Sequence, residues 1–289
     1  MNSNRSSRHH YIPKFLIKRF TDENGLLFVY DKERDVILKE QKSPKSIFFR
    51  WDRNTVDFNG TKKDNLESLY SALDDMLARD LDFVLKSGSI TPEQLTSLLL
   101  LATIQKWRVP NIDENFEKIK SSLTQEKLGI KISFKEDDSK EEKKMVEHIE
   151  KSDIFKAASR TTLPFLPLRN PSKLIELHNY SFINVNDQFP ALIGDCSILE
   201  KSNSDINEIE DFVFPLSFSH SLIFKKGTKK RITNGLFYIQ RDLAIIYNST
   251  KYVGCKNLKH LKQQVEAFRK VKNDGKLDNI NKFLFDFID

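Results

Sequence analysis

Residues 8–21 read RHHYIPKFLIKRFT, and we interpret the rest of the chain outward from this stretch. It places two histidines, a proline, three aromatic residues and several bases close to the N-terminus. Tails that only keep a protein in solution are poor in aromatic residues. We therefore expect the stretch to be built into the fold, as a short helix with Pro13 in its first turn. The polar residues before it, 1–8, are expected to be frayed.

The composition indicates a folded protein with a substantial core. The chain has 289 residues, of which 39% are hydrophobic and 30% charged, and we expect a single domain over residues 1–289. Phe occurs 22 times against 9 Gly and 9 Pro, so many rings must be buried. The net charge of +6 permits a phosphate-bearing partner, but it is equally typical of a mildly basic, solvated surface.

Cysteine usage and hydropathy indicate a cytoplasmic protein without membrane segments. Cys196 and Cys255 form no Cys-x-x-Cys pair, which argues against a zinc ribbon and fits a reducing compartment. The longest apolar run, residues 98–104, is far shorter than the roughly 18 residues of a membrane helix. No hydrophobic segment follows the polar N-terminus, so we expect no signal peptide.

The first half of the chain passes from strands to helices. Strands are predicted over 26–31, 36–38, 46–51 and 54–58, the first two as a hairpin. Two helices follow, over 64–86 with Asp64 as its cap, and over 91–108 after the start signal Thr91-Pro92. The second is apolar nearly all round, which predicts a place in the core. Residues 111–150 are rich in charge and indicate a solvated loop or insertion, or an exposed helix end. Residues 151–162 are a further helix candidate.

The second half returns to strands. They are predicted over 174–177, 181–185, 191–193, 212–217 and 221–224, followed by a helix over 234–248. A short extended piece at 253–255 precedes a closing helix that Asn257 can cap. The predicted fold class is α+β, with N-terminal strands, a central helical hairpin, C-terminal antiparallel strands and a closing helix.

Polar residues gather within apolar surroundings near the N-terminus and at the end of the second long helix. The first place holds His9 and His10 with Arg19; the second holds Gln105 and Arg108, which are three residues apart and share a helix face. Each place also has an ordinary structural explanation. A histidine beside aromatic residues can be a hydrogen-bonded core residue, and arginine suits the C-terminus of a helix.

A third polar place lies between two predicted strands, where residues 184–188 read NVNDQ. Asn186 and Asp187 are ordinary turn formers, but a carboxylate at a strand end is also a common catalytic group or metal ligand. The chain has no Gly-x-x-x-x-Gly-Lys loop, His-Glu-x-x-His pair or Gly-x-Ser-x-Gly elbow. The sequence therefore supplies candidate residues without a familiar catalytic motif.

Several short motifs follow one another along nearly the whole chain. They are His10-Tyr11-Ile12-Pro13-Lys14-Phe15-Leu16-Ile17-Lys18-Arg19-Phe20, Val29-Tyr30-Asp31, Gln105-Lys106-Trp107-Arg108-Val109-Pro110, the segment from Phe182 to Pro190, Pro215-Leu216-Ser217 and an Asn-rich helix from Asn234 onward. In this order they resemble the bacterial domain-of-unknown-function family numbered forty-two thirty-eight. The resemblance brings no established reaction.

The chain departs from the family pattern at two places. Asn186-Asp187-Gln188 stands where the family has Ser-Asp-Asn, and Phe189 intrudes before the proline. The resemblance also implies an acidic residue in the first long helix, for which both Glu67 and Asp74 are candidates. The acidic part of any catalytic set is thus left open.

One hypothesis is an enzyme, a metal-assisted phosphodiesterase or nuclease that acts on nucleic acid or a nucleotide. His10 and Asp187 would be catalytic, and Asp187 would bind a divalent metal, Mg or Mn. The substrate would be held by Arg19, Gln105, Arg108 and Asn186. A histidine, a carboxylate and arginines suit charge stabilisation at phosphorus.

The alternative hypothesis is a non-catalytic binding or sensor module, for example in a mobile element or in phage defence. The same polar residues would then form a buried structural network that joins the N-terminal segment to both halves of the chain. A pocket for a small anion is a third hypothesis. Whether His10, Arg108 and Asp187 meet in one open cleft decides between the first two hypotheses.

Overall fold

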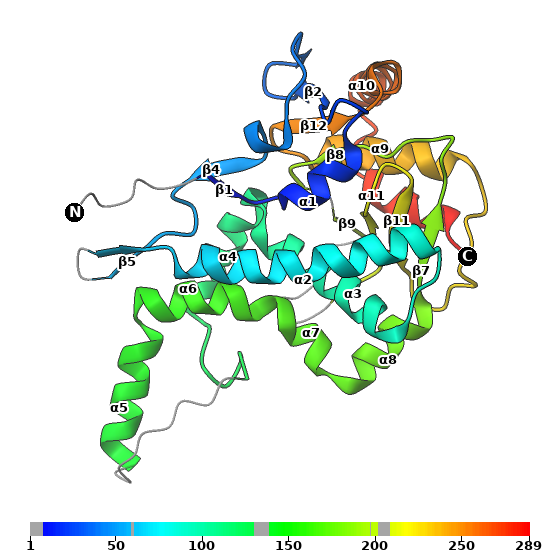
Figure 1. The fold of residues 1–289 in the computed structure, drawn as a ribbon. Coiled ribbons are helices and arrows are strands. Elements are labelled where there is room, and N and C mark those ends of the chain that lie inside the picture. Colours follow the sequence, from blue (N-terminus) through cyan, green and yellow to red (C-terminus); the bar gives the residue numbers. More distant parts are fainter. Residues whose placement is uncertain (1–7, 59–60, 130–138, 197, 202–208) are drawn as a thin grey trace.

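The computed structural model describes residues 8–58, 61–129, 139–196, 198–201 and 209–289. Within these residues the strands form antiparallel sheets (Figure 1). One four-stranded sheet has the order β3-β2-β12-β8, another has the order β7-β11-β10-β9, and two ribbons pair β1 with β4 and β5 with β6. The strands are β1 (Arg8–His10), β2 (Phe28–Asp31), β3 (Val36–Ile37), β4 (Phe49–Trp51), β5 (Val56–Phe58), β6 (Thr61–Lys63), β7 (Ser181–Val185), β8 (Ile193–Gly194), β9 (Leu199–Glu200), β10 (Phe212–Pro215), β11 (His220–Phe224) and β12 (Tyr252–Cys255).

The helices confirm the predicted α+β class, with a central hairpin of α2 and α3 and a long helix, α10, near the C-terminus (Figure 1). The predicted β-hairpin is also present as β2 and β3. The helices are α1 (Lys14–Ile17), α2 (Asn65–Ser87), α3 (Pro92–Arg108), α4 (Asp113–Lys120), α5 (Ser139–Glu150), α6 (Asp153–Thr162), α7 (Leu166–Arg169), α8 (Pro171–Tyr180), α9 (Leu236–Asn248), α10 (Leu258–Asn273) and α11 (Ile280–Leu284).

Local signals explain both ends of the turn between α2 and α3. Gly88 ends α2 with a φ of 66°, a left-handed conformation that glycine adopts without steric cost. Thr91 and Gln94 form a capping box: Gln94 N donates to Thr91 Oγ1 at 3.3 Å, and Thr91 N donates to Gln94 Oε1 at 2.9 Å. Pro92 occupies the first turn, as the sequence predicts.

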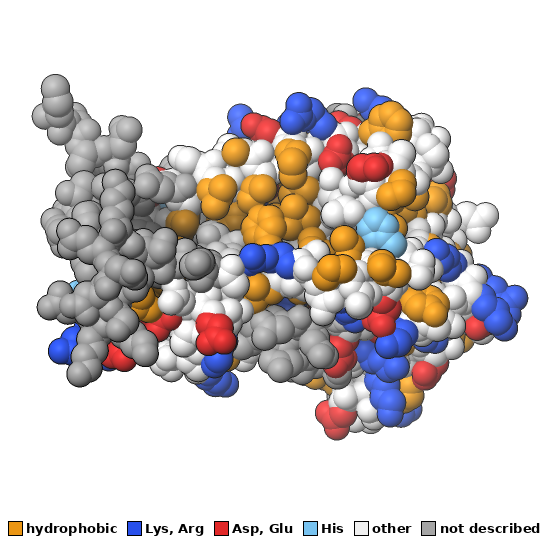
Figure 2. Space-filling model, turned by 90° about the horizontal axis from the view of Figure 1, so that it is seen from below, with side chains coloured by type: hydrophobic (Ala, Val, Ile, Leu, Met, Phe, Trp, Pro, Cys, Tyr) orange, Lys and Arg blue, Asp and Glu red, His pale blue; other side chains and the backbone are white. Residues whose placement is uncertain are grey.

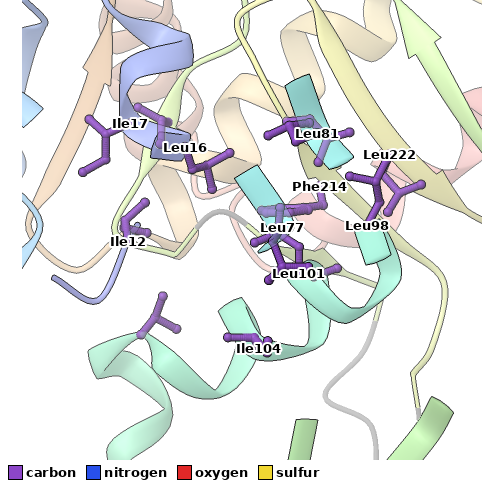
Figure 3. Close-up of a cluster of buried hydrophobic side chains, with 14 of the residues drawn as sticks. Ile12, Leu16, Ile17, Leu77, Leu81, Leu98, Leu101, Ile104, Phe214 and Leu222 are labelled. Atoms are coloured by element: carbon purple, nitrogen blue, oxygen red, sulfur yellow. The ribbon is translucent and has the colours of Figure 1, made fainter. Parts of the chain in front are cut away.

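The N-terminal segment is built into the main hydrophobic core, as expected. Figure 3 shows Ile12, Leu16 and Ile17 beside side chains from the helical hairpin and from β10 and β11. These partners include Leu77, Leu81, Leu98, Leu101, Phe214 and Leu222, all at most 1% exposed. Fully burying one such side chain contributes about 1.5–3 kcal/mol. The core therefore fixes the positions of β1 and α1 against α2 and α3.

A second hydrophobic cluster surrounds α9. This helix contacts α10, α11, β8 and β9, and its inward side chains include Phe237, Ile245 and Ile246. Asn257 caps α10, since its side chain accepts a hydrogen bond from His260 N at 3.0 Å. The predicted cap of the closing helix is thus confirmed.

Two sequence predictions need correction, and a third is made more specific. Residues 174–177 are not a strand but part of α8, because Asn170 caps this helix and Pro171 begins it. Arg8 is not frayed but belongs to β1; residues 1–7 lie outside the described part. The charge-rich segment 111–150 contains α4 and α5, and its residues 130–138 are likewise outside the description.

Some large hydrophobic side chains remain exposed. Leu69, Met76 and Phe83 of α2 and Ile175 of α8 are 37–62% exposed. The face seen from below carries hydrophobic side chains across its centre, and charged side chains lie mostly toward its edges (Figure 2). Among the helices of the described chain, none combines the length and the apolar character needed to cross a membrane.

Candidate functional site

His10 lies at the end of β1 and is only 5% exposed. Its Nε2 is 3.1 Å from the carbonyl oxygen of Pro44, which can only accept, so Nε2 carries the proton and donates. Burial lowers the pKa of His10, and the positive charges of Lys14 and Arg108 lower it further. The ring is therefore neutral near pH 7 and bonded to the backbone of a distant segment.

Gln105 joins α3 to the residue that follows His10. Its side chain is buried, and Nε2 donates to the carbonyl oxygen of Tyr11 at 2.9 Å. Within the described chain, Gln105 Oε1 is buried without a hydrogen-bond partner. The predicted residues His10 and Gln105 therefore do come together, through the backbone of the N-terminal segment.

Arg108 pairs with Asp74 across the helical hairpin. Its guanidinium is 3% exposed, Nη1 donates to Asp74 Oδ1 at 2.7 Å, and its central carbon lies 4.5 Å from the centre of the Tyr70 ring. Burial raises the pKa of Asp74, and Arg108 opposes that rise. Of the two acidic candidates, Asp74 is the one that contacts Arg108, whereas Glu67 accepts from Asn54 Nδ2 at 2.7 Å.

A second arginine group converges on Asp113 at the start of α4. Arg53 donates to both carboxylate oxygens, at 2.6 and 2.7 Å, and Arg160 of α6 donates to Oδ1 at 2.5 Å. The exposed Arg50 adds a longer contact of 3.3 Å. Burial acts to raise the pKa of Asp113, but the bonds from Arg53 and Arg160 outweigh it and lower the pKa. This group was not predicted from the sequence.

His9 completes the polar residues around the N-terminal segment. It is fully buried, and its Nδ1 accepts from Asn54 N at 3.0 Å. Its Nε2 is 4.0 Å from Asp64 Oδ1. Asp64 stands at the predicted cap position of α2, but its side chain accepts from Thr55 Oγ1 at 2.6 Å and makes no capping bond. His9 and several of the polar residues described above together form what we call the N-terminal polar cluster. Its members are His9, His10, Arg53, Asp74, Gln105, Arg108, Asp113 and Arg160.

Arg19 takes a different partner from the other predicted residues. Its guanidinium pairs with Asp82 of α2, and burial lowers its pKa. Its carbonyl oxygen accepts from Phe218 N at 3.2 Å, in the turn between β10 and β11. Arg19 thus links the N-terminal segment to the C-terminal sheet through its backbone.

Asn186 and Asp187 lie in the turn after β7. Asn186 Oδ1 accepts from the backbone N of Gln188 and of Phe189, both at 2.9 Å, so Asn186 shapes the turn. Asp187 is exposed. In the part of the chain that the structure describes, no hydrogen bond or ion pair joins Asp187 to His10, Gln105 or Arg108.

The charged neighbours of Asp187 come from the C-terminal half. Burial lowers the pKa of His220 and of Lys256, and the negative charge of Asp187 opposes both shifts. His220 Nδ1 is 2.9 Å from Ser219 Oγ, and Lys256 Nζ lies 3.0 Å from the centre of the Phe218 ring. We call Asn186, Asp187, His220 and Lys256 the Asp187 turn. Sequence analysis missed His220 and Lys256 because neither belongs to a recognisable motif.

Asp187 is the predicted ligand of a divalent metal. Over the described ranges, no group of three or more His, Cys, Asp or Glu residues is arranged to hold a metal ion. Mg and Mn prefer several oxygen ligands, and Asp187 alone does not supply them. The metal at Asp187 stays a prediction.

One comparison with known proteins gave a match. A family model described as "Protein of unknown function (DUF4238)" matches residues 8–187. This span begins at β1 and ends at Asp187, so it contains the whole N-terminal polar cluster but neither His220 nor Lys256. No curated protein and no solved structure matches the chain.

Proposed function

Since the chain belongs to the DUF4238 family of proteins of unknown function, we propose a function from its geometry: it is a non-catalytic binding or sensor module. In this module the N-terminal polar cluster is a structural network. Its hydrogen bonds and ion pairs connect the N-terminal segment to α3 and α3 to α2. They also connect the β4–β5 turn to α4 and α6.

The observation that carries the proposal is the burial of the predicted catalytic and binding residues together with their bonding to protein groups. His10, Gln105 and Arg108 are each at most 5% exposed, and each donates to a protein oxygen. A general acid or base has to reach its substrate. These side chains instead reach Pro44, Tyr11 and Asp74, which belong to other segments of the fold.

The experiment compares two variants with the wild type in two measurements: thermal unfolding and turnover of labelled RNA and DNA. His10→Ala removes a buried ring and leaves the carbonyl of Pro44 unpaired, at a cost of about 1–3 kcal/mol, which lowers the melting temperature by several degrees. The matched control is Asp187→Ala, which changes an exposed side chain. A His10→Ala protein that melts like the wild type but loses a measurable activity would refute the structural role.

A second candidate function is a phosphodiesterase whose centre is the Asp187 turn, with nucleic acid or a nucleotide as substrate. It is favoured by an exposed carboxylate within electrostatic reach of a histidine and a lysine. His220, rather than His10, would then be the acid or base, Asp187 would orient the attacking water, and Lys256 would hold the phosphate.

This second candidate is tested by turnover of labelled RNA and DNA, with Mg²⁺, with Mn²⁺ and with a chelator. Hydrolysis that Asp187→Ala and His220→Ala both abolish, without a change in melting temperature, would support it. The chelator arm tests the metal requirement. A role in phage defence or in a mobile element stays a prediction.

A further inference from the structure

The ribbon of β1 and β4 presents an aromatic face. The strands pair Arg8 with Trp51, His9 with Arg50, and His10 with Phe49. Because successive side chains of a strand point to opposite faces, Arg8, His10, Phe49 and Trp51 share one face. Figure 1 shows β1 and β4 side by side toward the end of the molecule where the N-terminus lies.

Trp51 is a large aromatic side chain of this ribbon that is exposed to solvent. It is 60% exposed, whereas the other tryptophan of the chain, Trp107, is 3% exposed. Its ring packs edge-on against Phe49, with ring centres 5.8 Å apart, and Phe49 in turn lies 5.6 Å from the His10 ring. Buried His10 is therefore the inner end of a row of ring contacts whose outer end, Trp51, is exposed to solvent.

The Arg8 guanidinium lies against these rings, and two exposed lysines are in neighbouring segments. The guanidinium carbon of Arg8 lies 4.9 Å from the centre of the Phe49 ring and 5.3 Å from that of Trp51. Its hydrogen bond goes to the carbonyl oxygen of Lys45 at 3.4 Å. Lys45 is exposed and follows Pro44, the partner of His10, and exposed Lys14 is near enough to lower the pKa of His10.

These three cations, like many other bases of the described chain, take no part in an ion pair. Among the described residues, none of the ion pairs involves Arg8, Lys14 or Lys45. Arg50, on the opposite face of the ribbon, is by contrast directed to Asp113. The exposed indole thus has the Arg8 guanidinium beside it. Two exposed lysines lie close by along the chain: Lys45, whose carbonyl oxygen accepts from Arg8, and Lys14, four residues after His10.

We propose that this face binds single-stranded nucleic acid, with an unpaired base stacked on Trp51 and backbone phosphates at Arg8, Lys14 and Lys45. Exposed aromatic rings beside cations are the common device for binding single strands, and stacking tolerates any base. A duplex offers no free base face for Trp51. The proposal names a ligand class for the proposed binding module and does not depend on chemistry at Asp187.

The test is binding of the full-length chain to fluorescent oligo-dT and oligo-rU of about 15 nucleotides, a few site sizes of a single-strand binder. Trp51→Ala is expected to weaken binding about tenfold or more. Lys14→Ala and Lys45→Ala are each expected to reduce the slope of log affinity against log salt by about 0.7. Because Trp107 is buried, quenching of intrinsic fluorescence on binding reports Trp51.

The controls use exposed side chains of the same kind elsewhere in the fold. Phe283→Ala removes a ring that is 50% exposed on α11, and Lys276→Ala removes a lysine that is 72% exposed. Both should bind like the wild type. Wild-type affinity in Trp51→Ala, equal binding of duplex DNA, or equal binding of poly-glutamate would each overturn the proposal, the last in favour of an acidic protein partner.

The binding proposal for the ribbon and the structural proposal for the N-terminal polar cluster can be refuted separately. Trp51→Ala should leave the melting temperature within about 2 °C of the wild type, since exposed substitutions usually cost little. His10→Ala tests the network through stability alone. Loss of oligonucleotide binding at unchanged stability therefore concerns only the ribbon.

Discussion

The N-terminal polar cluster and the Asp187 turn contain the same kinds of residue in opposite environments. In the cluster, His10 and Arg108 are buried and donate to protein oxygens. In the turn, Asp187 is exposed, and its histidine and lysine neighbours are only partly covered. The comparison teaches that the same residue types can be buried and paired or exposed to solvent, so residue type alone does not assign a role.

The largest expected effect is on the buried ion pair. Arg108→Ala leaves Asp74 without its cation and removes the contact with Tyr70, so we expect a loss of about 3–5 kcal/mol in the free energy of unfolding. Arg108→Lys retains the charge but not the guanidinium contact with the Tyr70 ring, and its loss of stability should be intermediate. Urea unfolding measures the free energy of unfolding of both variants. An Arg108→Ala protein with the wild-type urea midpoint would mean that this buried pair contributes no more to stability than the exposed Asp187 turn.

A smaller effect is expected from pH, through His10. Its pKa in the fold is below the ordinary value of 6.5, so in acid the unfolded chain takes up the proton more readily. The free energy of unfolding should therefore decrease as pH falls below about 6.5, by up to about 1.4 kcal/mol per pH unit for this group.

The matched variant for this pH effect is His10→Gln, which can still donate to Pro44 but does not titrate. Subtracting its pH profile from that of the wild type isolates the contribution of His10, because His220 titrates in both proteins. Superimposable profiles would mean that His10 is as free to protonate in the fold as in the unfolded chain.

The smallest effect is expected at the turn. Asp187→Ala removes an exposed carboxylate that takes no part in the backbone bonds of Asn186, so the free energy of unfolding should change by no more than about 0.5 kcal/mol. Thermal unfolding with Asn186→Ala as a comparison checks this. A large loss of unfolding free energy in Asp187→Ala, without one in Asn186→Ala, would mean that Asp187 stabilises the fold as the residues of the N-terminal polar cluster do.

Local signals in the sequence predicted elements well where they were applied. Thr91-Pro92 predicts the start of α3, and the structure has the complete capping box. The same kind of signal stands at Asn170-Pro171, but residues 174–177 look like a strand by composition, and α8 was missed there. The helix-start signal is the stronger indication, because the side chain of Asn170 accepts hydrogen bonds from backbone N–H groups of the first turn. The amino-acid composition of residues 174–177 carries no information about these bonds.

Contacts between distant segments could not be predicted in this way. The sequence leaves Glu67 and Asp74 equally suitable, and only the packing of α2 on α3 brings Asp74 to Arg108. Arg53 and Arg160 reach Asp113 across 60 and 47 residues, and β1 pairs with β4 across an intervening hairpin. These pairings depend on the tertiary arrangement, for which no local residue pattern exists.

The structural role of the cluster is tested most directly by a double-mutant cycle on Asp74 and Arg108. Urea unfolding of Asp74→Asn, Arg108→Leu and the double variant gives the interaction energy between the two side chains. We predict a favourable coupling of about 1–3 kcal/mol, with the double variant more stable than the sum of the single losses implies. Losses that add to within about 0.5 kcal/mol would contradict a network held together by this pair.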